Sequence, residues 1–160
     1  MRKWAAVIAA VLVLGVVNWL VLRNEQLLRE GEVFYLELAP VDPRALLQGD
    51  YMALNYAVAG ALSGSTNSSA AREGWALLSL DARRIASQPR EVAAGTPAGA
   101  NQVLVPFRSQ GWRVSVLSNA YFFEEGQAAR YQSARYGMFR SNGDGRALLV
   151  SLCDEQLKPL

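Results

Sequence analysis

Histidine is absent from this chain of 160 residues, and with it the usual general base, the commonest ligand of transition metals and the side chain that titrates near neutral pH. Lysine occurs only twice, at Lys3 near the N-terminus and at Lys158 on the C-terminal tail. A serine nucleophile activated by a lysine base would need a lysine held inside the fold. The sequence therefore offers neither a histidine-based nor a Ser/Lys catalytic site, and it predicts no cofactor and no metal.

Cysteine occurs once, at Cys153, so no disulfide can form within the chain. This residue follows Leu148-Leu149-Val150-Ser151-Leu152, a run typical of a strand. We therefore expect Cys153 to be buried. The alternative is an odd thiol that stays reactive.

Carboxylates are the remaining acid–base groups. Glu124 with Glu125, or Asp42 with Asp50, could in principle supply the acid and base of glycoside hydrolysis. Adjacent glutamates before a helix more often interact with its dipole, and Asp42 stands where a helix cap would. No D-x-D-x-D-G calcium spacing occurs. The composition thus favours a protein without catalysis.

A long uncharged run is the first feature that the sequence does have. Residues 4–22 carry no charge, and a helix over them spans roughly 28 Å, close to the hydrocarbon core of a bilayer. Trp4 and Trp19 would lie in the aromatic belts at its two interfaces. A cleaved signal peptide, the alternative, would have a shorter apolar core and small residues at a cleavage site. We expect a transmembrane signal anchor over 1–23 and a polar stalk over 24–31.

Charges beside the run indicate its orientation. Arg2 and Lys3 precede it, so the positive-inside rule places the N-terminus in the cytoplasm. Residues 32–160 would then lie beyond the inner membrane, in the periplasm of a Gram-negative cell. Removing Arg2, Lys3 and Arg23 leaves thirteen basic residues against fourteen acidic ones. This balance, without a basic cluster, argues against nucleic-acid binding.

Alternating apolar residues and turn signals predict that 32–160 form one β-rich domain. The expected strands are 32–39, 50–58, 74–80, 81–89, 102–108, 112–117, 138–140 and 146–153. Segments 60–72 and 92–100 are expected to be loops, the first of them mobile, and 127–136 a helix ended by Gly137. The sum is a mainly antiparallel barrel or sandwich of about seven or eight short strands with one helix near the C-terminus.

Segment 41–56 carries the densest set of signals in the chain. Asp42 is placed to cap a helical turn, and Gly49 is placed to end it. Arg44 and Asp50 flank this turn, and we expect a charge-assisted bond between them that locks it. The alternative is that Arg44 points outward to a carboxylate or phosphate of a partner.

The strand after this turn reads Gly49-Asp50-Tyr51-Met52-Ala53-Leu54-Asn55-Tyr56. Tyr51 and Tyr56 lie on its opposite faces, so we expect one in the core and the other exposed as an anchor for a partner. This octapeptide resembles the pattern of the GDYXXLXY protein family, and two other blocks resemble that family too. They are Pro40-Val41-Asp42-Pro43-Arg44 and Tyr121-Phe122-Phe123-Glu124-Glu125-Gly126. The resemblance implies a membrane-anchored bacterial protein without an assigned activity, an accessory subunit associated with a multi-spanning membrane protein.

Three hypotheses of function follow. The first is a single-pass, membrane-anchored periplasmic accessory or binding module that acts with a membrane-protein partner. The second is a carboxylate-based hydrolase or a small-ligand-binding barrel, and the third is a structural protein of the envelope. The candidate binding residues are Asp42, Arg44, Asp50, Tyr51, Tyr56, Glu124 and Glu125.

Overall fold

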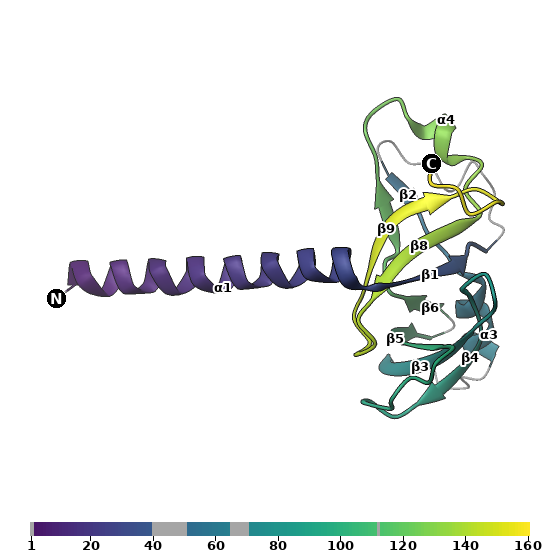
Figure 1. The fold of residues 1–160 in the computed structure, drawn as a ribbon, viewed down its shortest axis with the longest axis horizontal. Helices are drawn as coiled ribbons and strands as arrows, with labels where there is room; N and C mark the ends of the chain where they lie inside the picture. The colour runs from purple at the N-terminus through teal and green to yellow at the C-terminus, as the bar shows by residue number, and fades with distance from the viewer. Residues whose placement is uncertain (1, 40–50, 65–70, 112) are drawn as a thin grey trace.

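The computed structural model describes residues 2–39, 51–64, 71–111 and 113–160. Its first element, α1 (Arg2–Glu30), is one unbroken helix of 29 residues that projects from a compact β-rich part of the chain (Figure 1). The predicted apolar helix is therefore confirmed. It continues through the residues expected to form a stalk, so the stalk is the last part of the same helix.

Short strands are the main regular structure of the described chain after α1. In the described part they are β1 (Glu32–Glu37), β2 (Tyr51–Ala53), β3 (Arg72–Leu80), β4 (Ile85–Val92), β5 (Gln102–Gln110), β6 (Arg113–Val116), β7 (Ala120–Phe122), β8 (Tyr136–Ser141) and β9 (Ala147–Cys153). Two short helices interrupt them, α3 (Ala57–Gly64) and α4 (Ala128–Tyr131). The prediction of a mainly β domain is confirmed.

Two sheets contain all of these strands. The larger sheet has seven strands in the order β6-β5-β3-β4-β1-β8-β9, and the smaller one pairs β2 with β7. All neighbours are antiparallel except β1 and β4, which run parallel with Tyr35 opposite Ile85. A parallel pair requires a long crossover connection, and here the chain between β1 and β4 includes α3 and β3. The sheet is thus mainly antiparallel, as predicted, with one exception.

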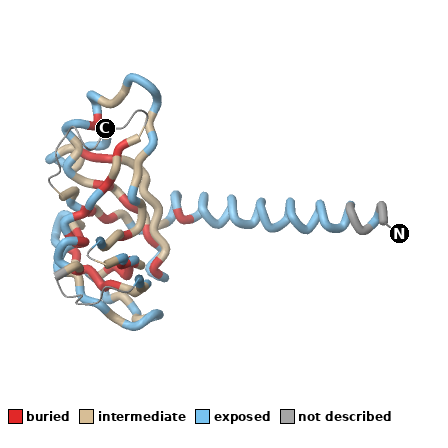
Figure 2. The backbone as a smooth tube through the Cα atoms, turned by 180° about the vertical axis from the view of Figure 1, so that it is seen from behind, coloured by how far each residue is buried: buried red, intermediate tan, exposed pale blue. Residues whose placement is uncertain are grey.

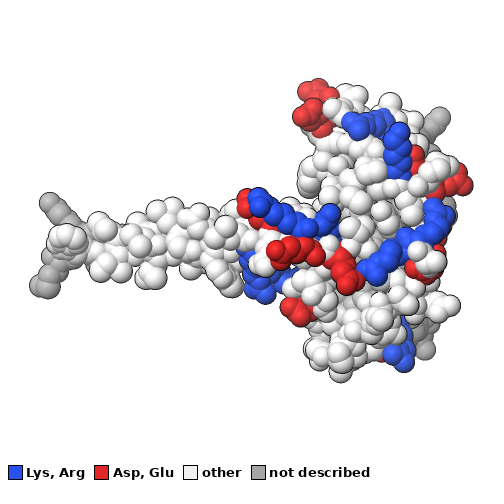
Figure 3. Space-filling view, viewed as in Figure 1, with Lys and Arg blue, Asp and Glu red and all other residues white. Residues whose placement is uncertain are grey.

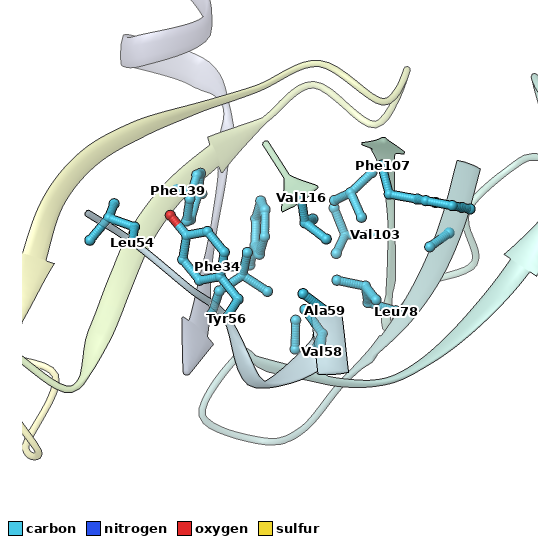
Figure 4. Packing of buried hydrophobic residues seen from close by; sticks show 14 of the residues in the cluster. Phe34, Leu54, Tyr56, Val58, Ala59, Leu78, Val103, Phe107, Val116 and Phe139 are labelled. Carbon is cyan, nitrogen blue, oxygen red and sulfur yellow. The ribbon is translucent and has the colours of Figure 1, made fainter. Parts of the chain in front are cut away.

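The larger sheet curls into a half-barrel around α3. This helix contacts β1, β4 and β6, although β6 is the end strand of the sheet and three strands separate it from β1. A flat sheet could not bring both strands to one short helix, so the sheet must bend. α3 turns Val58, Ala59 and Leu62 into the interior, where Figure 4 shows two of them facing Leu78.

α3 corrects two predictions from the sequence. The strand expected over 50–58 ends at Ala53, and the loop expected over 60–72 is helical as far as Gly64 and is part of β3 from Arg72. Residues 65–70 lie outside the described residues. Gly60 has a low helix propensity. Packing of Leu62, which is 2% exposed, outweighs this unfavourable propensity, since most helical stability in proteins comes from packing of an apolar face.

Aromatic rings on β1 and β8 form the centre of the core. Phe34 and Phe139 are opposite each other in the register of these strands, and their ring centroids lie 5.4 Å apart. Tyr56 packs edge-on against Phe139 at 5.8 Å, as Figure 4 shows. Buried residues run through the interior of the β-rich part in Figure 2, whereas α1 is exposed along almost all of its length. Cys153 is fully buried, as predicted.

The turn of the hairpin between β8 and β9 contains an Asn-Gly and an Asp-Gly pair, which tight hairpin turns favour. Gly143 and Gly145 both have positive φ, at 82° and 85°, which glycine adopts without steric strain. Asn142 and Asp144 brace the turn, because the Asp144 amide donates to Asn142 Oδ1 at 3.2 Å. β5 and β6 also pair as a hairpin, with Gly111 at φ 62° in its turn.

Two further segments differ from the expected boundaries. The helix expected over 127–136 is the single turn α4, because Tyr136 and Gly137 are part of β8. A side chain at Gly137 would be crowded there, since a Cβ would lie 3.0 Å from the Phe139 ring. The strand expected over 81–89 begins at Ile85, because Asp81 forms a turn in which its carboxylate accepts the amides of Arg83 and Ile85, each at 2.8 Å.

Candidate functional site

Three of the predicted binding residues lie outside the described residues. They are Asp42, Arg44 and Asp50, so the predicted lock between Arg44 and Asp50 stays a prediction. Tyr51, which follows them, is half-buried in β2, and its ring lies 5.8 Å from that of Phe122 on the paired strand β7.

Tyr56 is a core residue. It is 3% exposed, and its hydroxyl donates to the Ser118 carbonyl at 3.0 Å. Burial raises the pKa of this phenol well above its ordinary value. A neutral, hydrogen-bonded phenol of this kind stabilises the fold, and it is not accessible to a partner.

Glu124 and Glu125 lie in the exposed connection between β7 and α4. Glu124 accepts a hydrogen bond from the Gln127 side-chain amide at 3.1 Å. Neither glutamate lines the two hollows described below. Among the described residues, no group of three His, Cys, Asp or Glu side chains could hold a metal ion.

The aromatic block before these glutamates divides into packed and exposed rings. Tyr121 and Phe123 both contact the Tyr131 ring of α4, with centroid distances of 5.3 and 5.1 Å. Phe122, between them in sequence, is 75% exposed. Phe122 also lines the apolar groove described next, and a contiguous apolar surface of this kind is a candidate contact for a partner.

An apolar groove of about 700 Å³ runs between β9 and β7. We define this β9–β7 groove by the residues that line it, which include Trp75, Leu117, Tyr121, Phe122, Leu148 and Leu149. Phe139 of the core and Leu27 near the end of α1 also line it. The groove is therefore an opening in the side of the half-barrel that begins beside α1.

Two arginines bind the end of α1 to the hairpin β8–β9. Arg140 donates from Nη1 to the carbonyls of Arg29 and Gly31, at 3.0 and 3.3 Å, and Arg146 donates to Asn24 Oδ1 at 2.9 Å. A cation at the C-terminal end of a helix also interacts favourably with the helix dipole. Leu27, 6% exposed, packs at the same junction.

A hollow of about 680 Å³, lined by polar and apolar groups alike, lies beside the same junction. Arg23 and Glu30 of α1 line it together with Arg84, Asp144 and Arg146. Arg84 pairs with Glu32 at 2.6 Å and donates from Nε to the Val33 carbonyl at 3.0 Å. The charged residues around this hollow are therefore mixed in sign, and Figure 3 shows both signs gathered where α1 meets the β-rich part.

The model of the family described as GDYXXLXY protein matches residues 13–152 of the chain. This match covers most of the chain. The chain belongs to the GDYXXLXY family. No curated protein and no solved structure matches it.

The pattern that names the GDYXXLXY family is partly a packing motif in this member. Leu54 and Tyr56 are both buried, and both bind the connection between β6 and β7, since the Leu54 amide donates to the Asn119 carbonyl at 2.8 Å and Tyr56 binds Ser118. The motif thereby holds β7, with its exposed Phe122, against the half-barrel.

α1 is the one helix of the described chain that is long and apolar enough to cross a membrane, over Val7–Glu30. Trp4 and Trp19 are exposed on it, and the Arg23 guanidinium lies 5.3 Å from the centre of the Trp19 ring. Arg2 and Lys3 belong to its first turn, but their side chains lie outside the described ones. An N-terminal helix of this kind is consistent with a membrane location, as an anchor or as a signal sequence.

The groove and the two junction arginines were not predicted from the sequence. The groove joins strands that are far apart in the chain, so no local pattern describes it. One signal was available, because β9 carries no charged residue and no proline, whereas strands at a sheet edge commonly carry such residues to prevent further pairing.

Proposed function

We propose that this protein is a single-pass, membrane-anchored accessory or binding module. In this proposal α1 stays uncleaved in the inner membrane with its N-terminus in the cytoplasm, and the β-rich domain lies in the periplasm. There it acts with a multi-spanning membrane protein. The observation that carries the proposal is the exposed apolar surface of α1.

The exposure of α1 supports a bilayer as its surroundings. Val11, Leu12 and Leu14 are each more than half exposed, as are most of their apolar neighbours on the helix. Figure 3 shows no charged side chain along the middle of α1, and charges return where it meets the domain. Exposing apolar surface on all sides of a helix to water is unfavourable by roughly 25 cal/mol per Å². Burial of the helix in hydrocarbon removes that penalty.

The junction supports a module with a defined orientation. Arg140 and Arg146 hold the last turns of α1 against β8 and β9, so the domain does not hang on a flexible linker. At about 1.5 Å per residue, the eight residues from Arg23 to Glu30 lift the domain only roughly 12 Å above the apolar segment. The groove beside α1 is then presented close to the bilayer surface, where a membrane partner can reach it.

Orientation and partner are tested in separate experiments on the full chain. Ser87 lies exposed on β4, so Ser87→Cys should react with a membrane-impermeant maleimide added to cells with a permeabilised outer membrane. The buried Cys153 of the parent chain is the matched control and should not react. Labelling only after the inner membrane is lysed would overturn the proposed orientation.

The partner is tested by chemical crosslinking in native membranes followed by affinity purification and mass spectrometry. We expect reproducible recovery of one multi-spanning membrane protein. The control is a chain in which residues 1–31 are unchanged and an unrelated domain replaces the β-rich domain, and it should not recover this partner. Recovery of the protein alone, or recovery of the same proteins with the control chain, would overturn the proposal.

A further inference from the structure

We infer that the β9–β7 groove binds an extended, apolar peptide segment of the membrane partner, which adds to the outer edge of β9 as an extra strand. The inference rests on the proposed function, because it names the partner's mode of binding. It starts from the position of β9 at the end of the larger sheet.

Among the described residues, the first part of the outer edge of β9 has no strand paired with it. The Asn142 amide donates to the Arg146 carbonyl across the hairpin at 3.4 Å, so Arg146 faces β8. Backbone groups in an antiparallel strand alternate between its two sides. Counting on from Arg146, the N–H and C=O groups of Ala147 point to the outer side, away from β8, and so do those of Leu149, the last residue of β9 before its register with β8 shifts.

The chain itself already uses this edge at its far end. The Leu160 amide donates to the Leu152 carbonyl at 2.9 Å, and Pro159 forms a bridge with Cys153. Within the described residues, no strand pairs with β9 on that side before Leu152. A second extended segment therefore fits next to Ala147 and Leu149, in the same way that the C-terminal residues fit next to Leu152.

The groove favours a peptide over a lipid chain and specifies its side chains. A peptide can satisfy the outward groups of Ala147 and Leu149 with main-chain hydrogen bonds, whereas an acyl chain cannot. Side chains of an added strand alternate in direction, so every second one would face Trp75, Leu117 and Phe139 on the groove wall. These positions require apolar residues.

The position of the groove points to a segment that leaves the membrane. Leu27 near the end of α1 lines it, so a peptide emerging from the bilayer beside α1 reaches the groove within a few residues. Phe122, exposed on β7, stands opposite β9 and can cover the added strand.

A second copy of this chain fits less well. Two copies in one membrane would be related by an axis along α1, and β9 runs obliquely away from α1 (Figure 1). Rotation about that axis keeps the component of β9 along α1 in the same direction. The two β9 strands could not then form a regular antiparallel pair.

The first test places the photoreactive residue p-benzoylphenylalanine at Phe122 of the full chain in native membranes. The matched control carries it at Ser87 on β4. After irradiation, the adduct is mapped by mass spectrometry. We expect an adduct at Phe122, absent at Ser87, within an apolar segment next to a transmembrane span of another protein.

Substitutions on β9 then test strand addition. Ala147→Pro removes an outward N–H, and Ala147→Ser keeps it. We expect the adduct yield at Phe122 to fall roughly tenfold with proline, the factor that corresponds to about 1.4 kcal/mol, and to persist with serine. Leu148→Lys places a charge in the groove and should give a similar loss while keeping every N–H, so that a folding defect of the proline variant does not decide the outcome. Circular dichroism checks the fold of each variant.

The outcomes separate this inference from the proposed function. An adduct to lipid, to a second copy or to the chain itself overturns strand addition by a partner, as does a partner adduct that neither Ala147→Pro nor Leu148→Lys reduces. Recovery of a partner by chemical crosslinking without an adduct at Phe122 also overturns this inference alone. Failure to recover any partner in either experiment overturns both.

Discussion

Tyr56 illustrates at the scale of one residue how the family motif stabilises the fold. Its hydroxyl donates a part-buried hydrogen bond to the Ser118 carbonyl, so Tyr56→Phe leaves that carbonyl without this donor. We expect the free energy of unfolding to fall by about 1 kcal/mol, measured by urea denaturation in detergent. Tyr35→Phe, at a half-buried position on β1, is the control and should change stability less.

Tyr56 also predicts a pH dependence. Burial raises its pKa in the folded state, whereas in the unfolded chain the phenol titrates near 10. Above that pH the unfolded state releases a proton that the folded state retains, so this contribution to stability is complete below pH 10 and is lost as the pH rises. Above pH 10 the free energy of unfolding should decrease with pH more steeply in the parent chain than in Tyr56→Phe. The difference between the two slopes should be up to about 1.4 kcal/mol per pH unit. Parallel pH profiles of the two proteins would contradict this assignment.

Arg140 is the residue on which the rigid junction most directly depends. Arg140→Ala removes both hydrogen bonds to the end of α1 and a cation at the helix C-terminus, which we expect to weaken the junction by roughly 1–2 kcal/mol. The measurement is hydrogen exchange of residues 26–31, which should speed up while exchange in β3 and β5 stays unchanged. Arg140→Lys keeps the charge but not the planar guanidinium, so it should fall between the two.

At the scale of elements, the turn between β8 and β9 contrasts two glycines with nearly the same φ. A Cβ on Gly145 would overlap the Trp75 ring, whereas one on Gly143 meets nothing within 4 Å. Gly143→Ala should therefore lower the free energy of unfolding only by the backbone term of about 1–2 kcal/mol. Gly145→Ala adds an overpacking term of about 1–3 kcal/mol. Thermal unfolding compares the two, and equal losses would show that Trp75 moves aside without penalty.

The same turn shows what the sequence could predict. Asn142-Gly143-Asp144-Gly145 encodes its conformation locally, and the alternation of Phe34 and Leu36 likewise identifies β1. α3 was missed because the alternating burial of Met52, Leu54, Tyr56 and Val58 continues from a strand into a helix. Periodicity alone cannot separate the two over so few residues.

The candidate site was less predictable than the fold for a physical reason. The sequence placed Tyr51 and Tyr56 on opposite faces without deciding which of them is buried, and the groove requires β9 to lie opposite β7. That arrangement depends on the curl of the sheet around α3 and on the parallel pairing of β1 with β4. Local patterns do not encode either of them.

At the scale of the whole molecule, three features act together. α1 presents an apolar surface that the domain does not cover, the arginines of the junction fix the domain relative to α1, and the β9–β7 groove opens beside that junction. Their combination supports the proposed anchor, in which one face of the domain would meet whatever leaves the membrane next to α1.

The role of α1 can be tested by adding charge at its middle. Leu12 and Val16 are both exposed, and they lie one turn apart on the helix. An arginine near the bilayer centre costs about 2.5–3.5 kcal/mol on insertion scales, so Leu12→Arg with Val16→Arg should move most of the protein from the carbonate-resistant membrane fraction to the soluble fraction. Leu12→Ile with Val16→Leu is the control and should remain in the membrane.

Intact mass of the membrane-bound protein separates the two forms of anchoring, because an uncleaved anchor retains residues 1–23 and a signal sequence does not. Carbonate-resistant sedimentation of the arginine variant would show that α1 is not what holds the protein in the membrane.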